Sequence, residues 1–287
     1  MDKYKILSDG SLSSAPQLGW IKLIDNGGNE FDSRKYGVLR TTPRAVYSAR
    51  TGSVIQIPGR EEPLFVQSCM RSQKDISITI GVTDERIAGD VLNAFCRNGK
   101  LIISTHPNLY YKAHVLESAV SEGITRRFSE ITISYSASAY RYQLDEPIIK
   151  SGKLAEDGTY AGGIFEFEQQ FPYSYEESEP KIYIITQSSA QTDNLNADIY
   201  ADNAERSFNA SGLSPAKVYC IDSELMSFYE YGDVSEDGSI SKNDVFRDVT
   251  HKTIGDFPVL KGILKHKIVY RGYINSIWVQ MNKRWNI

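Results

Sequence analysis

The chain has 287 residues, 41% of them hydrophobic and 24% charged, with a formal net charge of −4. This composition is typical of a folded protein and excludes a largely disordered chain. Since no apolar run approaches the roughly 20 residues that cross a bilayer, we expect no membrane insertion. The N-terminus lacks an apolar signal region, so we also expect synthesis and folding in a cytoplasm.

Charge is unevenly distributed along the chain. Residues 1–145 contain 18 Lys and Arg against 15 Asp and Glu, a net charge of +3, whereas residues 146–287 contain 14 against 21, a net charge of −7. This shift predicts two domains, 1–145 and 146–287, joined by a charged, proline-containing linker at 144–152. Neither half has the dense basic cluster typical of a protein that reads nucleic-acid sequence.

Short strands and turns fill the beginning of the first half. Residues 19–24 are apolar-rich and end in Asp25-Asn26-Gly27-Gly28, a hairpin signal because Asn-Gly tolerates positive φ. Residues 45–56 then lead into a turn formed by Ile57, Pro58, Gly59, Arg60 and Glu61, with a second proline at Pro63. A Pro-Gly pair fixes a tight turn, so this region predicts a long hairpin with a rigid, polar tip.

One helix and several alternating strands follow. Residues 76–82 alternate Ile and Val with small residues, the period of a strand with one solvated face. An apolar stripe from Ile87 to Phe95 predicts a helix that Thr83 or Asp84 caps and that Gly99 terminates. Further strands are expected at 101–104, 110–116 and 131–135.

The second half shows only strand patterns. They fall at 165–168, 181–186, 198–201, 217–221, 226–231, 267–270 and 276–281. Seven or more short strands separated by turns indicate a β-sandwich or jelly roll. The predicted fold class is therefore mainly β: a strand-rich first domain with one α-helix and a long hairpin arm, then an all-β sandwich.

Residues 233–244 match part of the pattern of a calcium-binding loop. Asp233, Ser235 and Asp237 occupy ligand positions of an EF-hand-like loop, and Gly238 stands at its sharp turn. However, Asp244 is too short for the usual bidentate ligand, and the preceding residues predict a strand where an EF-hand has a helix. A polar loop of the sandwich is the favoured interpretation, and we predict no metal site and no cofactor.

Catalytic patterns do not emerge from the sequence. The histidines form no zinc-ligand pair, and there is no phosphate-binding loop and no nucleophile elbow. Glu166 and Glu168 could mimic the paired carboxylates of a glycosidase. Because they alternate with Phe165 and Phe167, they are better interpreted as the solvated face of a strand. We therefore predict that the protein is not an enzyme.

Several segments, taken in order, carry a family resemblance. The turn Ile57–Glu61 is followed by an alternating strand, a single helix, a short strand and the segment His106–Ala113. The second half contains Tyr219–Ser223 and, after a variable loop, Gly255–Leu260. Together these segments resemble the siphophage distal tail protein family. An acidic residue usually stands in that family where this chain has His106, so the role of this side chain is open.

The resemblance implies a structural subunit of a phage tail tip, or baseplate. Six first domains would form a ring that caps the tail tube and leaves a channel for DNA ejection. The second domain would be a galectin-like sandwich that helps to hold the host-adhesion device. The expected partners are further copies of the chain in a hexamer, the tail tube protein, the tail hub or tail-associated lysin, and a receptor-binding protein. The arm tip, Ile57 to Glu61, would belong to the ring interface, and the protein would reside at the virion tail tip.

Two other classes of protein compete with this interpretation. A carbohydrate-binding module of a phage adhesin could stack a cell-wall sugar on Trp278, Trp285 or an exposed tyrosine. The alternation of Ile277 and Val279 around Trp278 favours a packing role for that ring instead. The third class, a cell-wall hydrolase, lacks a catalytic constellation. No sequence-specific nucleic-acid binding is expected.

Overall fold

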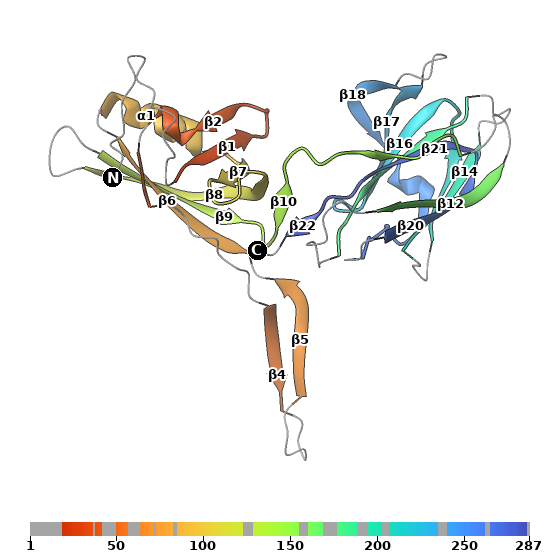
Figure 1. Ribbon diagram of the computed structural model, residues 1–287, viewed down its shortest axis with the longest axis horizontal. Coiled ribbons are helices and arrows are strands. Elements are labelled where there is room, and N and C mark those ends of the chain that lie inside the picture. Colours follow the sequence, from red (N-terminus) through yellow and green to blue (C-terminus); the bar gives the residue numbers. More distant parts are fainter. Residues whose placement is uncertain are drawn as a thin grey trace. The chain divides into compact units, whose positions relative to one another are not determined.

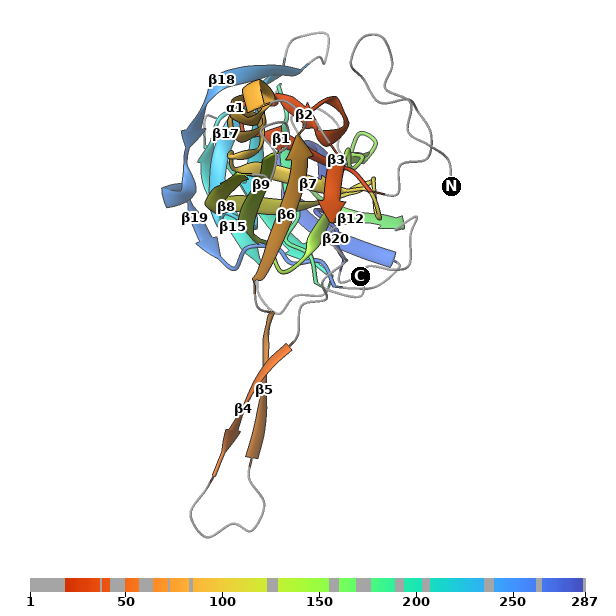
Figure 2. The same cartoon turned by 90° about the vertical axis from the view of Figure 1, so that its left-hand side faces the viewer.

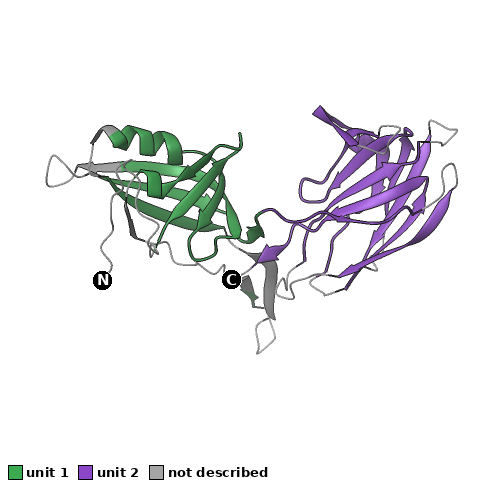
Figure 3. Cartoon of the chain, turned by 45° about the horizontal axis from the view of Figure 1, so that its top comes forward, with its two compact units in different colours: residues 1–144, 286–287 green, residues 145–285 purple. Residues whose placement is uncertain are grey.

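The fold is mainly β, with one α-helix (Figure 1). The computed structural model describes residues 19–36, 38–41, 50–56, 64–71, 73–82, 85–122, 129–154, 160–168, 177–188, 194–202, 207–234, 240–261 and 265–285. The chain divides into two compact units (Figure 3). Unit 1 comprises Met1–Leu144 with Asn286–Ile287, and unit 2 comprises Asp145–Trp285.

Unit 1 is built on one antiparallel sheet. Its strands are β1 (Ile21–Asp25), β2 (Glu30–Asp32), β3 (Val38–Thr41), β6 (Lys74–Val82), β7 (Gly99–Ile103), β8 (Leu109–Glu122), β9 (Ser129–Ala137) and β10 (Arg141–Gln143). The strand order is β2-β1-β7-β8-β9-β6-β3, and β10 pairs with β8. A short 3₁₀ helix, Ser33–Lys35, follows β2. The predicted first hairpin is confirmed: β1 and β2 pair, Gly28 has φ +84°, and Asp25 accepts backbone hydrogen bonds within the turn.

The helix α1 (Glu85–Phe95) packs against the sheet of unit 1. Val91 and Phe95 are fully buried among the isoleucines of β6 and β9, because the predicted apolar stripe faces the sheet. The Tyr135 hydroxyl of β9 donates to the Phe95 carbonyl at the end of the helix. The helix prediction is therefore confirmed, while its proposed caps, Thr83 and Asp84, lie outside the described residues.

The predicted role of Gly99 as a helix stop is wrong. The helix ends at Phe95, and Gly99 is the first residue of β7, where it pairs with Asp25 of β1. A Cβ atom on Gly99 would overlap the carbonyl oxygen of Ile24. A glycine is required at this position because the backbones of β1 and β7 approach each other too closely for a side chain.

Two further strands, β4 (Arg50–Ile55) and β5 (Leu64–Arg71), pair with each other in a separate two-stranded sheet. Figures 1 and 2 both draw them as a hairpin distinct from the main sheet of unit 1. The strands of the predicted long hairpin are thus confirmed. Its predicted tip, Ile57, Pro58, Gly59, Arg60 and Glu61, lies outside the described residues.

Unit 2 is a sandwich of two antiparallel sheets. Its strands are β11 (Ile149–Lys150), β12 (Ala161–Glu168), β13 (Lys181–Thr186), β14 (Leu195–Ala201), β15 (Phe208–Leu213), β16 (Lys217–Asp222), β17 (Ser227–Val234), β18 (Ile240–Asp248), β19 (Thr253–Gly255), β20 (Lys265–Gly272) and β21 (Ile274–Gln280). The short strand β22 (Arg284–Trp285) is part of neither sheet. One sheet has the order β11-β21-β13-β16-β17-β18 and the other β12-β20-β14-β15-β19. The predicted β-sandwich is confirmed.

The core of unit 2 lies between these two sheets. The six-stranded sheet contributes inward side chains such as Ile182, Ile221 and Phe228, all fully buried. The five-stranded sheet contributes Phe208 and Ile268 from the other side. Alternate residues of each strand therefore face inward, which leaves the intervening residues on the two outer faces of the sandwich.

Candidate functional site

The hairpin of β4 and β5 exposes apolar side chains on both of its faces. Val54 is 62% exposed and Ile55 is 47% exposed. Because successive strand residues point to opposite faces, neither face of the hairpin is covered at this point. A lone two-stranded hairpin is at best marginally stable in water, so its exposed apolar surface favours a contact with another chain.

A buried arginine in unit 1 is held by a neutral histidine. Arg141, on β10, donates through Nη1 to Nδ1 of His106 at 2.7 Å and through Nε to the Tyr111 hydroxyl at 2.6 Å. An arginine can only donate, so Nδ1 of His106 must carry no proton. Burial and the Arg141 charge both lower the pKa of His106. The histidine therefore accepts this hydrogen bond as a neutral group.

His106 was noted in the sequence, but its partner Arg141 was not predicted. Arg141 lies 35 residues further along the chain, and only the pairing of β8 with β10 brings the two side chains together. The Arg141 guanidinium also lies over the Tyr111 ring, 5.2 Å from its centroid. The cluster joins β8, β10 and the turn between β7 and β8, and this arrangement indicates a structural role.

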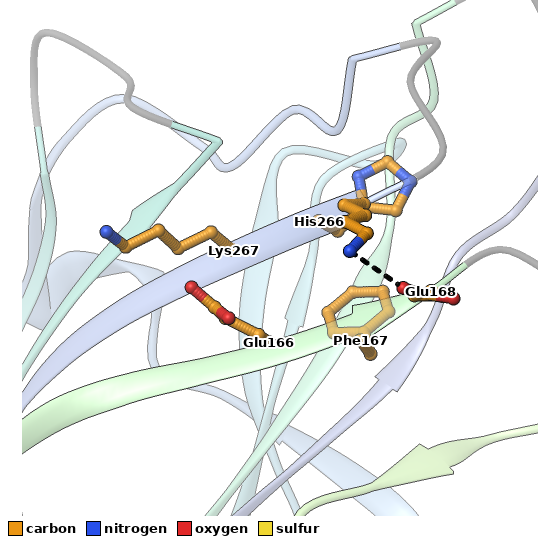
Figure 4. A pocket seen from close by; sticks show the side chains of 6 residues that line it. Glu166, Phe167, Glu168, His266 and Lys267 are labelled. Atoms are coloured by element: carbon orange, nitrogen blue, oxygen red, sulfur yellow. Dashed lines mark ion pairs between the residues drawn. The ribbon is translucent and has the colours of Figure 1, made fainter.

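A second polar cluster lies beneath a pocket of about 260 Å³ in unit 2 (Figure 4). The pocket is lined by residues of β12 and β20, including Phe167 and His266. His266 is buried, stacks on Phe167 with ring centroids 5.3 Å apart, and bonds through Nδ1 to Asp202 Oδ2 at 2.8 Å. Asp202 also accepts the backbone N–H groups of Lys261 and Lys267, each at 2.9 Å.

The environment of Asp202 stabilises its carboxylate. Burial alone would raise the pKa of Asp202, but the hydrogen bonds from His266, Lys267 and Lys261 outweigh it and hold the pKa below its ordinary value. Asp202 has φ +47°, a left-handed conformation that Asp tolerates better than most residues. The cluster thus fastens the segment after β14 to the beginning of β20, and the sequence alone did not reveal it.

The paired carboxylates of β12 lie on its outward face, as predicted. Glu166 and Glu168 are exposed, whereas Phe167 between them is buried. They face Lys267 and Lys265 on β20, and Lys265 forms a salt bridge with Glu168 at 3.1 Å (Figure 4). The carboxylates are therefore half of a charged cross-strand ladder.

The segment predicted as a candidate calcium loop forms parts of two strands. Asp233 is in β17, Asp244 is in β18, and residues 235–239 between the strands lie outside the described residues. Asp233 pairs in register with Ser241 and forms a salt bridge with Lys217, which also bonds Glu230. Across the part of the chain that the structure describes, no group of three His, Cys, Asp or Glu side chains could hold a metal ion.

The tryptophans proposed for sugar stacking have other contacts. Trp285 is only 8% exposed. Trp278 points out of the six-stranded sheet, but the Lys150 ammonium lies over its ring, 4.1 Å from the centroid.

Within the described residues, no helix is long and apolar enough to cross a membrane.

Comparison with known proteins gives a likeness in structure alone. No family model and no curated protein sequence matches the chain. The crystal structure of Dit (gp 19.1) of phage SPP1, described as a paradigm of the hub adsorption apparatus in phages that infect Gram-positive bacteria, matches with a TM-score of 0.53 and 11% identity. The match covers 90% of this chain and 97% of that one. The VP2 subviral particle of infectious bursal disease virus matches with a TM-score of only 0.18, 10% identity, and coverage of 98% and 70%. The chain therefore shares its fold, over nearly its whole length, with a phage hub protein.

Proposed function

We propose that this protein is a structural subunit of a phage tail tip, a distal tail protein that joins the tail tube to the tail hub and the host-adhesion device. The observation that carries this proposal is the fold shared with the SPP1 Dit protein over 90% of this chain and 97% of that one. A match of this extent includes both units. The ordered sequence segments described above resemble the same class of protein independently.

In this proposal the first domain, residues 1–145, forms a hexameric ring at the end of the tail tube, with an open channel for DNA ejection. A closed ring requires each subunit to offer two different surfaces, one of which binds the next subunit. The β4–β5 hairpin is a suitable arm for that contact, because Val54 and Ile55 are exposed on its opposite faces. Its tip, Ile57 to Glu61, would complete the interface.

The second domain, residues 146–287, would be a galectin-like sandwich that helps to hold the receptor-binding protein. The weak charge of the first domain, +3 from its 18 basic and 15 acidic residues, suits a channel that DNA passes without binding, because each neutralised phosphate would add affinity. The protein would act at the virion tail tip without catalysis and would bind no specific nucleic-acid sequence.

The alternative of a carbohydrate-binding module gains no support from the two tryptophans that suggested it. Trp285 is buried, and the ammonium of Lys150 occupies the ring of Trp278. Sugar stacking needs a ring face that is free to meet the sugar. We therefore retain the tail-tip function.

Electron microscopy of the purified chain, alone and mixed with the tail tube protein, tests this function. We expect six-fold rings with an open centre, or such rings capping the tubes. Replacing Val54 and Ile55 together by Ser should abolish the rings, whereas Ile254→Ser, at an exposed apolar position of unit 2, should leave them intact. Monomers that neither close into rings nor cap tubes would refute the proposal.

A further inference from the structure

The chain contains two Asn-Gly bonds, Asn26-Gly27 and Asn98-Gly99. An Asn-Gly bond is chemically labile, because the backbone nitrogen of the glycine can attack the side-chain amide of the asparagine and expel ammonia. Glycine favours this attack, since it has no Cβ atom to shield its nitrogen and its backbone is permissive. The reaction also requires that the amide and the nitrogen are free to approach each other, and the fold gives the two bonds different freedom to do so.

Asn26 stands in an exposed turn, and its side chain is free to rotate. The turn joins β1 to β2 and is closed by a hydrogen bond from the Gly28 N–H to the Asp25 carbonyl at 3.0 Å. Asn26 and Gly27 are the two central residues of this β-turn, and both are exposed. In the part of the chain that the structure describes, no hydrogen bond holds the side-chain amide of Asn26. The amide can therefore turn towards the Gly27 nitrogen.

Asn98 is restrained on both sides of its bond to Gly99. Its side-chain oxygen accepts the backbone N–H of Val115 on β8 at 3.0 Å. Gly99 is the first residue of β7 and is paired with β1 on one side and β8 on the other. A Cβ atom at Gly99 would lie 2.1 Å from the carbonyl oxygen of Ile24, so the neighbouring backbone is packed directly against it. Reaction at Asn98 would require the loss of these contacts.

A carboxylate holds the proton of the nitrogen that would attack Asn26. The Gly27 N–H donates to Asp25 Oδ1 at 2.9 Å, and the same oxygen accepts the backbone N–H of Asn29 at 2.8 Å. Hydrogen bonds from Asn29, and also from Gly27 and Arg97, hold the pKa of Asp25 below its ordinary value, so the carboxylate is ionised at neutral pH. The attacking nitrogen must lose its proton, and the adjacent negative charge opposes that loss. Asp25 therefore slows the reaction.

We propose that Asn26 is a site of spontaneous deamidation in the folded protein, that the fold protects Asn98, and that Asp25 restrains the rate at Asn26. The Gly27 nitrogen loses its proton to solvent and forms a bond to Cγ of Asn26. The bond from Cγ to Nδ2 then breaks, and Nδ2 leaves as ammonia after taking up a proton from water. The product is a succinimide ring. This inference is independent of the proposed function.

Hydrolysis of the succinimide gives two products. Water that breaks the bond between Cγ and the Gly27 nitrogen leaves aspartate in a normal backbone. Water that breaks the bond between the backbone carbonyl carbon and the same nitrogen leaves isoaspartate, whose backbone runs through the former side chain. In sum, an amide and one water become a carboxylic acid and ammonia. Each product places a second negative charge beside Asp25, because a carboxylic acid of this kind is ionised at neutral pH.

This modification would alter a contact between the β1–β2 turn and the residues after α1. Arg97 donates to Asp25 at 3.1 Å, and its guanidinium lies 5.2 Å from the centroid of the Phe31 ring. Its Nε also donates to the carbonyl of Asn93 in the helix at 2.6 Å. A new carboxylate at residue 26 competes with Asp25 for Arg97, and isoaspartate lengthens the backbone of the turn. Both changes loosen the hairpin.

Peptide mapping by mass spectrometry, on the full-length chain incubated in neutral buffer, tests this proposal. Aspartate and isoaspartate both differ from asparagine in mass, and chromatography separates the two products from each other. In the folded chain, Asn26 should convert at least about 10-fold faster than Asn98, whose reaction requires the loss of a hydrogen bond. In urea, where the strands no longer hold Asn98, the two rates should become similar.

A matched pair of variants tests the role of the carboxylate. Asp25→Asn keeps the size of the side chain and an acceptor oxygen and removes the charge, so it should accelerate conversion of Asn26 by about 10-fold, the difference between a charged and a neutral acceptor. Asp75→Asn, at an exposed position of β6, should leave the rate unchanged. Slow conversion of Asn98 in both variants would show that the sheet stays folded, so that a faster rate at Asn26 reports on the turn.

Three results would overturn the proposal. Equal conversion of Asn26 and Asn98 in the folded chain would show that the fold does not protect Asn98. An intact Asn26 in the folded chain, with conversion only in urea, would show that the turn is too rigid to react. An unchanged or slower rate in Asp25→Asn would show that the carboxylate does not restrain the attack. None of these results bears on the assembly of rings, so the proposed function stands or falls separately.

Discussion

Removing the carboxylate of Asp202 should destabilise unit 2 clearly without changing its apolar core. The carboxylate accepts three hydrogen bonds, from Nδ1 of His266 and from the backbone N–H groups of Lys261 and Lys267. Each buried donor that loses its acceptor costs about 1–3 kcal/mol. Because water can enter the adjacent pocket, Asp202→Ala should lower the free energy of unfolding of unit 2 by roughly 3–5 kcal/mol.

The matched variant Asp202→Asn separates hydrogen bonding from backbone strain. Asn tolerates the left-handed conformation at φ +47° and keeps one acceptor oxygen, so its cost should be smaller, roughly 1–3 kcal/mol. The stability of both variants is measured by urea unfolding, with tryptophan emission as the signal. The variants are made in a Trp20→Phe background, so that Trp278 and Trp285 report on unit 2. Glu168→Gln, at the exposed rim of the same pocket, is the control and should change stability by less than about 0.5 kcal/mol.

The pH dependence gives a second check with a defined sign. The pKa of Asp202 is lowered in the folded protein from an ordinary value of 3.8. The stability that the ionised carboxylate contributes is therefore fully present above pH 3.8 and is lost as the pH falls through the lowered folded pKa. The difference between the wild type and Asp202→Asn should be constant near neutrality and shrink in that acid range. If Asp202→Ala unfolds at the same urea concentration as the Glu168→Gln control, the assignment of the cluster as a fastening is wrong.

Three further predictions concern single residues. The pKa of His106 is lowered in the folded protein, so the stability that the neutral histidine contributes is present above pH 6.5 and is lost as the pH falls below that value. His106→Asp gives Arg141 a carboxylate partner and should therefore raise the melting temperature at pH 5.5. A variant whose melting temperature depends on pH as the wild type's does would contradict this prediction. Lys283→Met leaves the buried Glu146 carboxylate without its cation and should cost about 3 kcal/mol at pH 8. Burial raises the pKa of Glu146, so the free-energy cost of Lys283→Met, measured by denaturant titration, should fall from pH 8 towards pH 5. An equal cost at pH 8 and pH 5 would argue against this role of Lys283. Gly99→Ala forces β1 and β7 apart and should cost about 2 kcal/mol or more by thermal unfolding; a stable variant would show that the backbones can separate.

Strands with a regular buried face could be predicted from the sequence. In β6 every second residue from Lys74 to Ile80 is buried, and in β12 Phe167 faces inward between two exposed glutamates. The single helix was recognisable for the same reason, because its apolar stripe repeats with the helical period. In each of these elements, local pattern and tertiary environment agree.

Edge strands and long-range polar contacts could not be predicted in this way. β18 is mostly exposed and lacks alternation, so its first residues resembled a polar loop. Its strand structure depends on pairing with β17, which the local sequence does not encode. Likewise, Asp202 and His266 are 64 residues apart, and His106 and Arg141 are 35 apart. Only the folded sheets bring these partners together.

The strand order of unit 2 has a consequence for how the protein is made. β20 lies between β12 and β14, and β21 lies between β11 and β13, so each of the two sheets is completed by one strand of the segment 265–280. These strands are among the last of unit 2 to leave the ribosome. Until then, β12 and β11 have no neighbour to pair with, and Phe167 lacks the ring of His266 on which it stacks. Unit 2 must therefore fold late in synthesis, and a chain stopped before residue 265 would expose open sheet edges that favour aggregation.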